Sequence, residues 1–227
     1  MFARILGPAL LLISILAVSG CVTDQSSAIL RHPAPPTVQL RNVYRPPLDG
    51  RVLRVAVLPL AGDVQPPDAL HEMDKTFLAE FNKAQMFEGT GVTRAEMVEM
   101  TRQEQISSVE AIPTELITLL RQKYDVDAVL FTDITHYRPY RPIAISVRTK
   151  LVSLGNQGVL WAIDSTFDSQ EPGVAAAART FGKLTGQNQM NVMAADSAGV
   201  LLSPMRFARF VAREIFSTLP ARLSRPK

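Results

Sequence analysis

The sequence VDAVLFTDITHYRPYRPIAISVRTKLVSLGNQGVLWAIDSTFD, at residues 126–168, decides the fold class of this chain. It contains three long runs rich in Val, Ile, Phe, Thr and Tyr: Val126–Tyr137, Ile143–Leu154 and Val159–Phe167. Runs of this composition, bounded by Gly and Pro, are typical of β-strands. Residues Gly155–Gly158 predict a hairpin between the last two strands, because glycine and asparagine tolerate the positive φ angles that tight turns require.

The last of these strands predicts which side of the sheet is buried. Apolar side chains share one face and polar side chains the other, because successive residues of a strand point to opposite sides. The apolar face carries Val159, Trp161, Ile163 and Phe167, and the polar face carries Asp164, Thr166 and Asp168. We therefore expect one face of this strand in the core and the other in water.

The segments before and after this block predict one more strand and several helices. The near-continuous apolar run Val52–Leu60 is typical of a strand covered on both faces. An extended piece is expected at residues 86–92 and a loop at residues 182–199. Helices are expected at residues 66–83, 93–102, 113–124, 171–181 and 204–219, the second of them with Thr93 and Glu96 as a capping box. The fold class is therefore α/β, a mixed sheet of about four to five strands with helices packed on it.

The amino-terminal residues resemble a bacterial lipoprotein signal. Arg4 precedes an apolar run, Ile5–Val18, and the run ends in Val18-Ser19-Gly20-Cys21, which is similar to a lipobox. The resemblance implies that the Cys21 sulfur receives a diacylglyceryl group and that the new amino terminus is acylated. An ordinary membrane span is disfavoured, since the apolar run is about 15 residues against the roughly 20 needed to cross a bilayer.

This signal sets the expected domain boundaries and location. Residues 1–20 are expected to be a signal peptide, 21–50 the lipidated cysteine with an extended Pro-rich tether, 51–219 a single periplasmic α/β domain and 220–227 a tail. Val22 follows the cysteine, whereas Asp at that position is associated with retention in the inner membrane. We therefore expect an outer-membrane lipoprotein of the cell envelope that faces the periplasm.

The amino-acid composition restricts the classes of partner that are expected. The chain is 47% apolar and 20% charged, with a formal net charge of +3 and a single cysteine. These values are typical of a globular protein. The basic residues are spread along the chain and form no stripe that suits phosphate backbones, so no nucleic-acid partner is expected.

No catalytic or metal motif is evident. The histidines at positions 32, 71 and 136 lie in unrelated contexts, there is no His-Glu-x-x-His, and neither a metal nor a cofactor is predicted. Asp133, Asp164 and Asp168 are one alternative, as an acid and base pair across strands. Polar strand faces carry such residues routinely, and we expect no enzyme activity.

Two groups of residues are candidate contact surfaces. Tyr-Arg-Pro occurs three times, starting at residues 44, 137 and 140, and proline interrupts ladder pairing. We therefore expect residues 136–142 to project from the sheet and to offer a partner four side chains, Tyr137, Arg138, Tyr140 and Arg141; the alternative is a solvated connection. The basic face of the last helix, with Arg206, Arg209 and Arg213, suits anionic lipid or an acidic neighbour, or is simply solvated.

The lipobox, the tether and three strand motifs together resemble the curli-secretion lipoprotein superfamily, which includes exopolysaccharide-export and peptidoglycan-synthase-activating lipoproteins. The strand motifs are Val-Ala-Val-Leu-Pro-Leu at residues 55–60, Val-Asp-Ala-Val-Leu-Phe-Thr-Asp-Ile-Thr at residues 126–135 and Gly-Val-Leu-Trp at residues 158–161. The resemblance implies a noncatalytic α/β domain that acts by protein contact, as a docking module or in a ring. The curli channel has two membrane-crossing hairpins per subunit, and only residues 143–167 are long enough to consider here.

The sequence thus predicts a membrane-anchored periplasmic lipoprotein that acts as a docking or assembly module for envelope components. Its expected partners are the lipid bilayer, through acylated Cys21, and an envelope protein, with a homo-oligomer as an alternative. Two other functions stay open at this point. One is a ring or pore subunit of an export system, and the other is an envelope hydrolase that uses the strand carboxylates.

Overall fold

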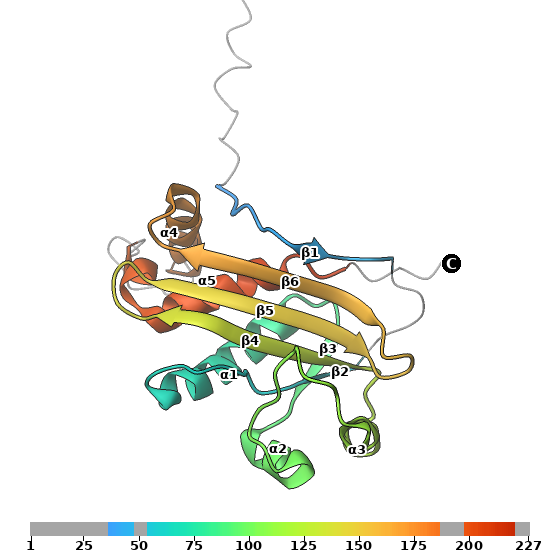
Figure 1. Cartoon of the computed structure of the whole chain (residues 1–227). Helices are drawn as coiled ribbons and strands as arrows, with labels where there is room; N and C mark the ends of the chain where they lie inside the picture. Colours follow the sequence, from blue (N-terminus) through green and yellow to red (C-terminus); the bar gives the residue numbers. More distant parts are fainter. Residues whose placement is uncertain (1–35, 48–53, 187–197, 221–227) are drawn as a thin grey trace, which may run out of the picture. The chain divides into compact units, whose positions relative to one another are not determined.

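A six-stranded mixed sheet forms the centre of the computed structural model, with strands in the order β1-β6-β5-β4-β2-β3 (Figure 1). The structure describes residues 36–47, 54–186 and 198–220, all within one unit of the chain. The strands are β1 (Val43–Tyr44), β2 (Arg54–Val57), β3 (Glu88–Gly91), β4 (Ala128–Arg138), β5 (Ala144–Ser153) and β6 (Val159–Asp168). The helices are α1 (Pro67–Lys83), α2 (Arg94–Thr101), α3 (Thr114–Tyr124), α4 (Pro172–Gly186) and α5 (Pro204–Phe216), with a short 3₁₀ helix η1 (Gly199–Leu202) before α5.

The three strands predicted from residues 126–168 are confirmed as β4, β5 and β6. They pair antiparallel in sequence order, whereas β2 pairs parallel with both β4 and β3. Parallel neighbours need a crossover connection, usually a helix, whereas antiparallel neighbours can be joined by a turn. The predicted mixed sheet is therefore confirmed, and pairing changes from parallel to antiparallel at β4.

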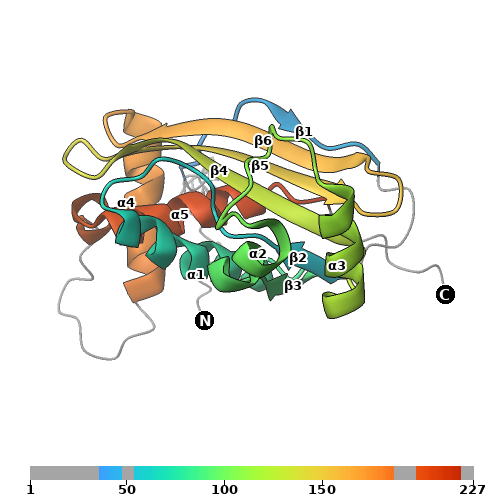
Figure 2. The same ribbon diagram turned by 60° about the horizontal axis from the view of Figure 1, so that its bottom comes forward.

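The larger core lies between the sheet and helices α1, α4 and α5, which pack on one face of it (Figure 2). Trp161 of β6 is fully buried there, and its indole N–H donates to the hydroxyl of Thr218, 3.1 Å away. Phe216 of α5 meets Phe77 and Phe81 of α1 edge-on, with ring centroids 6.0 and 5.3 Å apart. Such edge-to-face contacts stabilise aromatic clusters beyond simple burial.

A second core covers only part of the opposite face. Met97 of α2 and Leu116 and Leu120 of α3 pack with Val129 and Phe131 of β4. Among the described residues, no residue of β6 belongs to this cluster. The predicted burial of the first strand on both faces is confirmed, because alternate residues of β2 join the two cores. Strands β5 and β6 are instead covered mainly on the side of α1, α4 and α5.

The predicted capping box at α2 is also confirmed. The Thr93 hydroxyl accepts from the Glu96 backbone N–H, and the Glu96 carboxylate accepts from the Thr93 N–H. A hydrogen bond from Lys123 and those from Thr93 lower the pKa of Glu96 to about 2. Because Lys123 belongs to α3, this carboxylate also ties α2 to its neighbour.

Three expectations need correction or restriction. The sheet has six strands rather than four to five, because β1 forms at residues 43–44 within the stretch expected to be an extended tether. Helix α4 continues to Gly186, into the stretch expected to be a loop. The signal peptide, Cys21 and residues 221–227 of the tail lie outside the described residues. No described helix combines the length and the apolar character needed to span a bilayer.

One glycine sets how the chain leaves β2. Gly62 has a φ of 147°, and a Cβ built on it lies 2.5 Å from the carbonyl oxygen of Ile134. The neighbouring Ala61 is held against β4, since its N–H donates to Thr132 and its carbonyl accepts from Ile134. The backbone at Gly62 therefore has no room to move away from the added atom.

Gly62→Ala is expected to lower the free energy of unfolding by about 2 kcal/mol or more, because it combines a steric clash with an unfavourable φ. Gly173→Ala is the matched control: a Cβ there meets nothing within 4 Å, and alanine favours the helix by up to about 1 kcal/mol. Urea unfolding of both variants tests this. Equal stability of the two variants would show that the Gly62 backbone is not constrained in this way.

Candidate functional site

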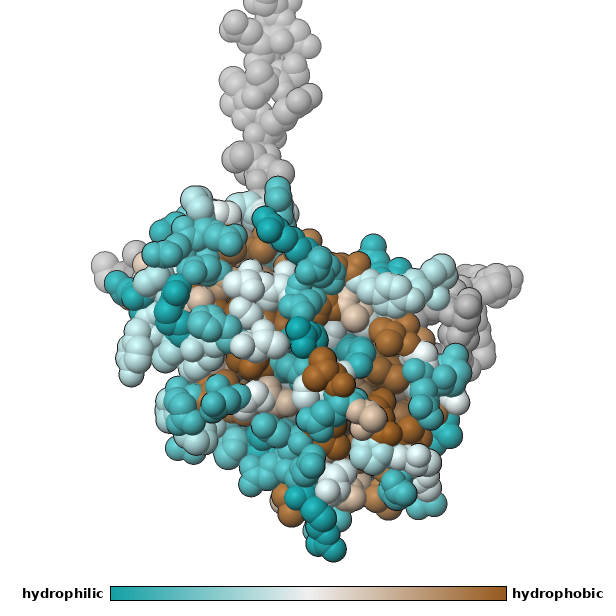
Figure 3. All heavy atoms as spheres, viewed as in Figure 1, coloured by the Kyte–Doolittle hydropathy of each residue, from teal (hydrophilic) through white to brown (hydrophobic). Residues whose placement is uncertain are grey.

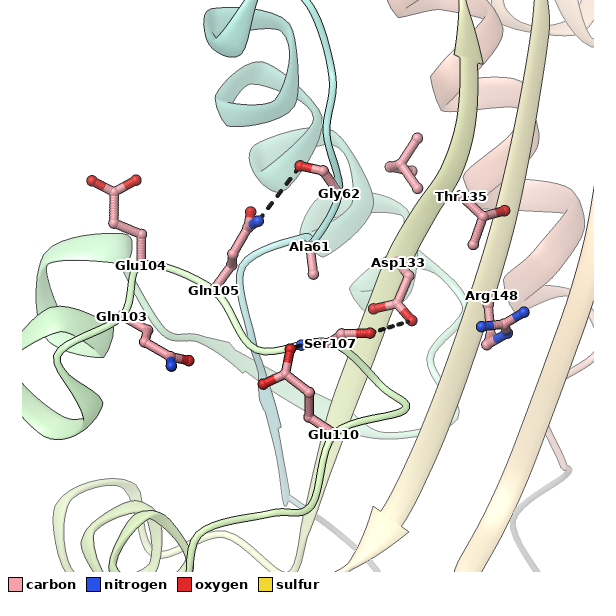
Figure 4. Close-up of a pocket in the computed structure, with 11 residues that line it drawn as sticks. Ala61, Gly62, Gln103, Glu104, Gln105, Ser107, Glu110, Asp133, Thr135 and Arg148 are labelled. Carbon is pink, nitrogen blue, oxygen red and sulfur yellow. Dashed lines mark hydrogen bonds between the residues drawn. The ribbon is translucent and has the colours of Figure 1, made fainter.

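A polar pocket of about 520 Å³ lies where the end of β2, the loop after α2 and strands β4 and β5 meet (Figure 4). Its polar lining includes the side chains of Gln103, Gln105, Glu104, Glu110 and Arg148. In Figure 4, Ser107 and Asp133 point toward one another and are joined by a hydrogen bond. Asp133, one of the carboxylates that the sequence suggested for catalysis, lines this pocket. The pocket is therefore the candidate catalytic or binding site.

Asp133 is used to hold the loop after α2. Its side chain accepts from the Ser108 N–H at 2.9 Å, the Ser108 hydroxyl at 2.5 Å and the Ser107 hydroxyl at 3.1 Å. The residue is only 5% exposed. A buried carboxylate is stable only when such donors replace water. Asp133 therefore fixes the loop that forms one wall of the pocket.

The other two carboxylates also have local partners. Asp164 accepts from the Nε of Arg148 at 2.9 Å, and Asp168 accepts from Arg138 at 2.8 Å. By strand register, Arg148 lies between Asp133 and Asp164, so these acids are two strand spacings, on the order of 10 Å, apart. The three acids suggested for catalysis are thus separate structural contacts, and they do not come together as an acid and base pair.

The pocket also lacks the other groups that nucleophilic catalysis needs. The Ser107 hydroxyl donates to Asp133 and accepts from the Val109 N–H, and none of the described residues lining the pocket is a histidine. Within the described ranges, no three His, Cys, Asp or Glu residues are grouped to hold a metal ion. The arrangement can offer hydrogen bonds to a polar group, without an activated nucleophile.

The Tyr-Arg-Pro segment forms the turn between β4 and β5. Arg138 fixes it from within, because its Nε donates to the Pro142 carbonyl at 2.5 Å while its other end pairs with Asp168. Tyr137 packs against the main core, and this burial, with the Glu72 carboxylate nearby, raises the pKa of its hydroxyl. Tyr140 and Arg141 are displayed at the tip, with Tyr140 81% exposed. Two of the four predicted contact residues are thus displayed, and two support them.

The predicted basic face of α5 is divided in the same way. Arg209 donates to the carboxylate of Glu80 on α1 at 2.8 Å, and both Arg209 and Arg213 lie over the ring of Phe181, 6.0 and 5.3 Å from its centroid. Arg206 is exposed. Two of the three arginines therefore link α5 to α1 and α4, in addition to any external role.

Sequence reasoning missed Glu80, which is buried at 6% exposure and pairs with both Arg209 and Lys83. A signal was present in the sequence. Glu80 follows Met73 and Phe77 at helical spacing, so it lies on the apolar side of α1. An acid on such a stripe requires cationic partners, and Lys83 of the same helix and Arg209 of α5 provide them here.

The fold and these surfaces define a mixed α/β domain with a rigid displayed turn. No protein-family model matches the chain, and no curated protein sequence does so. Similar solved structures include a PelC dodecamer from Paraburkholderia phytofirmans, with 15% identity and a TM-score of 0.45 over 80% of this chain and 97% of that one. Lipoprotein GNA1162 from Neisseria meningitidis has 18% identity and a TM-score of 0.42, over 60% of this chain and 97% of that one.

A further match is the LpoB C-terminal domain from Salmonella enterica, with 13% identity and a TM-score of 0.32 over 52% of this chain and 85% of that one. All three of these structures are less than 25% identical to this chain, with TM-scores below 0.5.

The role assigned to Asp133 is testable. Asp133→Asn is expected to cost about 1–3 kcal/mol of unfolding free energy, because an amide accepts fewer of the three converging hydrogen bonds. Hydrogen exchange of residues 105–110 should rise with it. Asp164→Asn is the matched control and should change stability by less than about 1 kcal/mol, since its pair with Arg148 is about 40% exposed on both sides. Unchanged exchange in the Asp133 variant would contradict the role in loop fixation.

Proposed function

We propose that this chain is an envelope lipoprotein whose α/β domain acts without catalysis as a docking module for another envelope protein. The observation that carries the proposal is the β4–β5 turn, where Tyr140 and Arg141 are exposed on a backbone that Arg138 holds in place. Tyrosine and arginine are enriched at the energetic centres of protein interfaces. The turn therefore combines suitable side chains with a fixed geometry.

The fixed geometry matters for affinity. Binding to a flexible loop costs the free energy needed to order that loop, whereas a preorganised turn avoids much of this cost. Arg138 is joined at one end to Asp168 and at the other to the Pro142 carbonyl, so the turn is braced across β4, β5 and β6. Tyr137 anchors its base in the core.

The anchor in this proposal is Cys21, acylated after removal of residues 1–20. Two or more acyl chains on one residue give durable membrane attachment. The 14 residues between Cys21 and Pro36 reach on the order of 40 Å if extended, at roughly 3.1 Å each. We propose the outer membrane, with the domain facing the periplasm, since Val22 and not Asp follows the cysteine.

Cys21→Ser is expected to abolish acylation and to release a folded protein into the soluble periplasmic fraction. Metabolic labelling with a radioactive fatty acid, followed by cell fractionation, measures both effects. Circular dichroism of the released variant provides the control for folding. Normal membrane retention of this variant would refute the proposed anchor.

A photocrosslinking residue in place of Tyr140 should capture a partner in intact cells. Arg141→Ala should reduce this capture several-fold without changing stability, because the side chain is exposed. The matched control is the same photocrosslinker at Val109, an apolar residue that is 68% exposed elsewhere on the surface. Capture at Val109 with none at position 140 would contradict the proposal that the turn is the docking surface.

Native mass of the detergent-extracted protein separates the docking module from the alternative ring or pore subunit. A monomer, free or with a partner, fits the proposal, whereas a defined high-order oligomer would replace it with the ring. The envelope hydrolase would require Asp133, Asp164 or Asp168 for activity, and the structure gives each of these acids a local structural contact.

A further inference from the structure

The two edges of the sheet are treated differently. At the β3 edge, the Asn82 side chain of α1 acts as a substitute strand: its Oδ1 accepts from the Gly89 N–H at 2.8 Å and its Nδ2 donates to the Gly89 carbonyl at 3.1 Å. Both outward backbone groups of Gly89 are therefore occupied. Exposed edges otherwise invite pairing with another chain, and natural proteins block them with devices of this kind.

The β6 edge is covered by a separate piece of chain, residues 36–44, which we call the strap. It includes β1, which pairs antiparallel with β6 through Val43 and Tyr44. Beyond β1, the Asp164 N–H donates to the Asn42 carbonyl and the Arg41 N–H donates to the Ser165 hydroxyl, each at 3.3 Å. The strap therefore follows a strand of ten residues but forms only a two-residue ladder with it.

Several observations show that the strap is held weakly. None of residues 36–47 is buried, and the two strap side chains that pack against the main core as partly buried hydrophobics are Val38 and Leu40. The two 3.3 Å hydrogen bonds are longer than the usual 2.9–3.0 Å. Asn42 has a φ of 53°, a left-handed conformation that interrupts the extended chain.

A pocket of about 490 Å³ that opens to solvent also lies beside the strap. It is lined by strap residues between positions 37 and 42, by residues 164–166 of β6 and by the start of α4. The strap thus lies along the edge without the close packing that the β4–β6 strands share with one another.

From this contrast we infer that the strap is a displaceable cover and that the β6 edge binds an extended strand from a partner in its place. The strap itself shows that this edge accepts an antiparallel segment. The partner segment is an extended peptide with two apolar side chains two residues apart, which replace Val38 and Leu40 on the core. Main-chain hydrogen bonds provide affinity in this mode of recognition, and alternate side chains provide specificity.

The inference accounts for the different treatment of the two edges. Asn82 is an integral part of α1, so it stays close to the β3 edge whenever the core is folded. The strap precedes β2 in the chain, and the side chains by which it packs on the core, Val38 and Leu40, are half-buried. A competing strand therefore has to overcome only the strap's own weak contacts and its high effective concentration.

A disulfide lock tests this inference. Tyr44 and Ala162 are direct partners across β1 and β6, and paired residues of antiparallel strands have Cα atoms about 4.5–5.5 Å apart, within the range that a disulfide bridges. Tyr44→Cys/Ala162→Cys is made in the full chain with Cys21→Ser, which leaves only the two new cysteines. The probe is a fluorescent peptide with the strap sequence, PTVQLRNVY.

The peptide is expected to bind the reduced protein and to lose at least tenfold in affinity when the lock is oxidised. Leu40→Asp in an unlocked chain weakens the strap and should tighten peptide binding roughly tenfold, while Asn82→Ala should leave it unchanged. A peptide with Asp at the positions of Val38 and Leu40 is the control for specificity. Hydrogen exchange at the Asp164 amide reports separately whether the lock has closed.

Equal peptide binding by the oxidised and reduced forms would overturn the inference, because the peptide would then bind away from the β6 edge. Absence of binding to the Leu40→Asp chain, with its fold confirmed by circular dichroism, would overturn it as well. Both results leave the anchor at Cys21 and the β4–β5 docking turn untouched, so this test fails independently of the proposed function.

Discussion

The sheet is buried on both faces at β2 and β4 but mainly on one face at β5 and β6. The other features of the structure follow from this constraint. The two cores meet at β2, whose alternate residues Val55 and Ala56 belong to opposite cores and are fully buried. The helices that join parallel strands pack on the faces of a sheet, so this half is covered twice. Strands joined by turns have no connecting helix to cover them. The outer face of β5 and β6 is therefore covered mainly by its own side chains.

The polar residues of that outer face satisfy one another. Arg148 pairs with Asp164, Arg138 pairs with Asp168, and the hydroxyls of Ser146 and Thr166 are 2.9 Å apart. The space-filling view shows hydrophilic and apolar residues interspersed over the sheet face seen in Figure 1 (Figure 3). Asp164 and Asp168, which the sequence suggested for catalysis, therefore serve pairing between strands, which contributes about 0.2–1 kcal/mol per pair. The same pairing braces the displayed turn.

Features that depend on local spacing could be predicted from the sequence, and features that depend on distant partners could not. The capping box needs only Thr93 and Glu96, and the faces of β6 follow from alternation alone. By contrast, the strap contacts residues more than 120 positions later, as Arg41 does with Ser165, and a two-residue strand has no period to detect. Of the turn residues, the exposure of Tyr140 follows from the flanking prolines, whereas the ion pair of Arg138 depends on Asp168, 30 positions away.

The proposed anchor and the strap are consecutive in the chain, and this order has a mechanical consequence. Any pull on an acylated Cys21 reaches the strap before it reaches the sheet. The strap is held by a two-residue ladder, half-buried side chains and two long hydrogen bonds, whereas the strands behind it are fixed by a core in which Trp161 and Phe216 are almost completely buried. The weaker element therefore yields first. If Cys21 is acylated as proposed, tension between the membrane and a partner would therefore uncover the β6 edge before it disturbs the folded core.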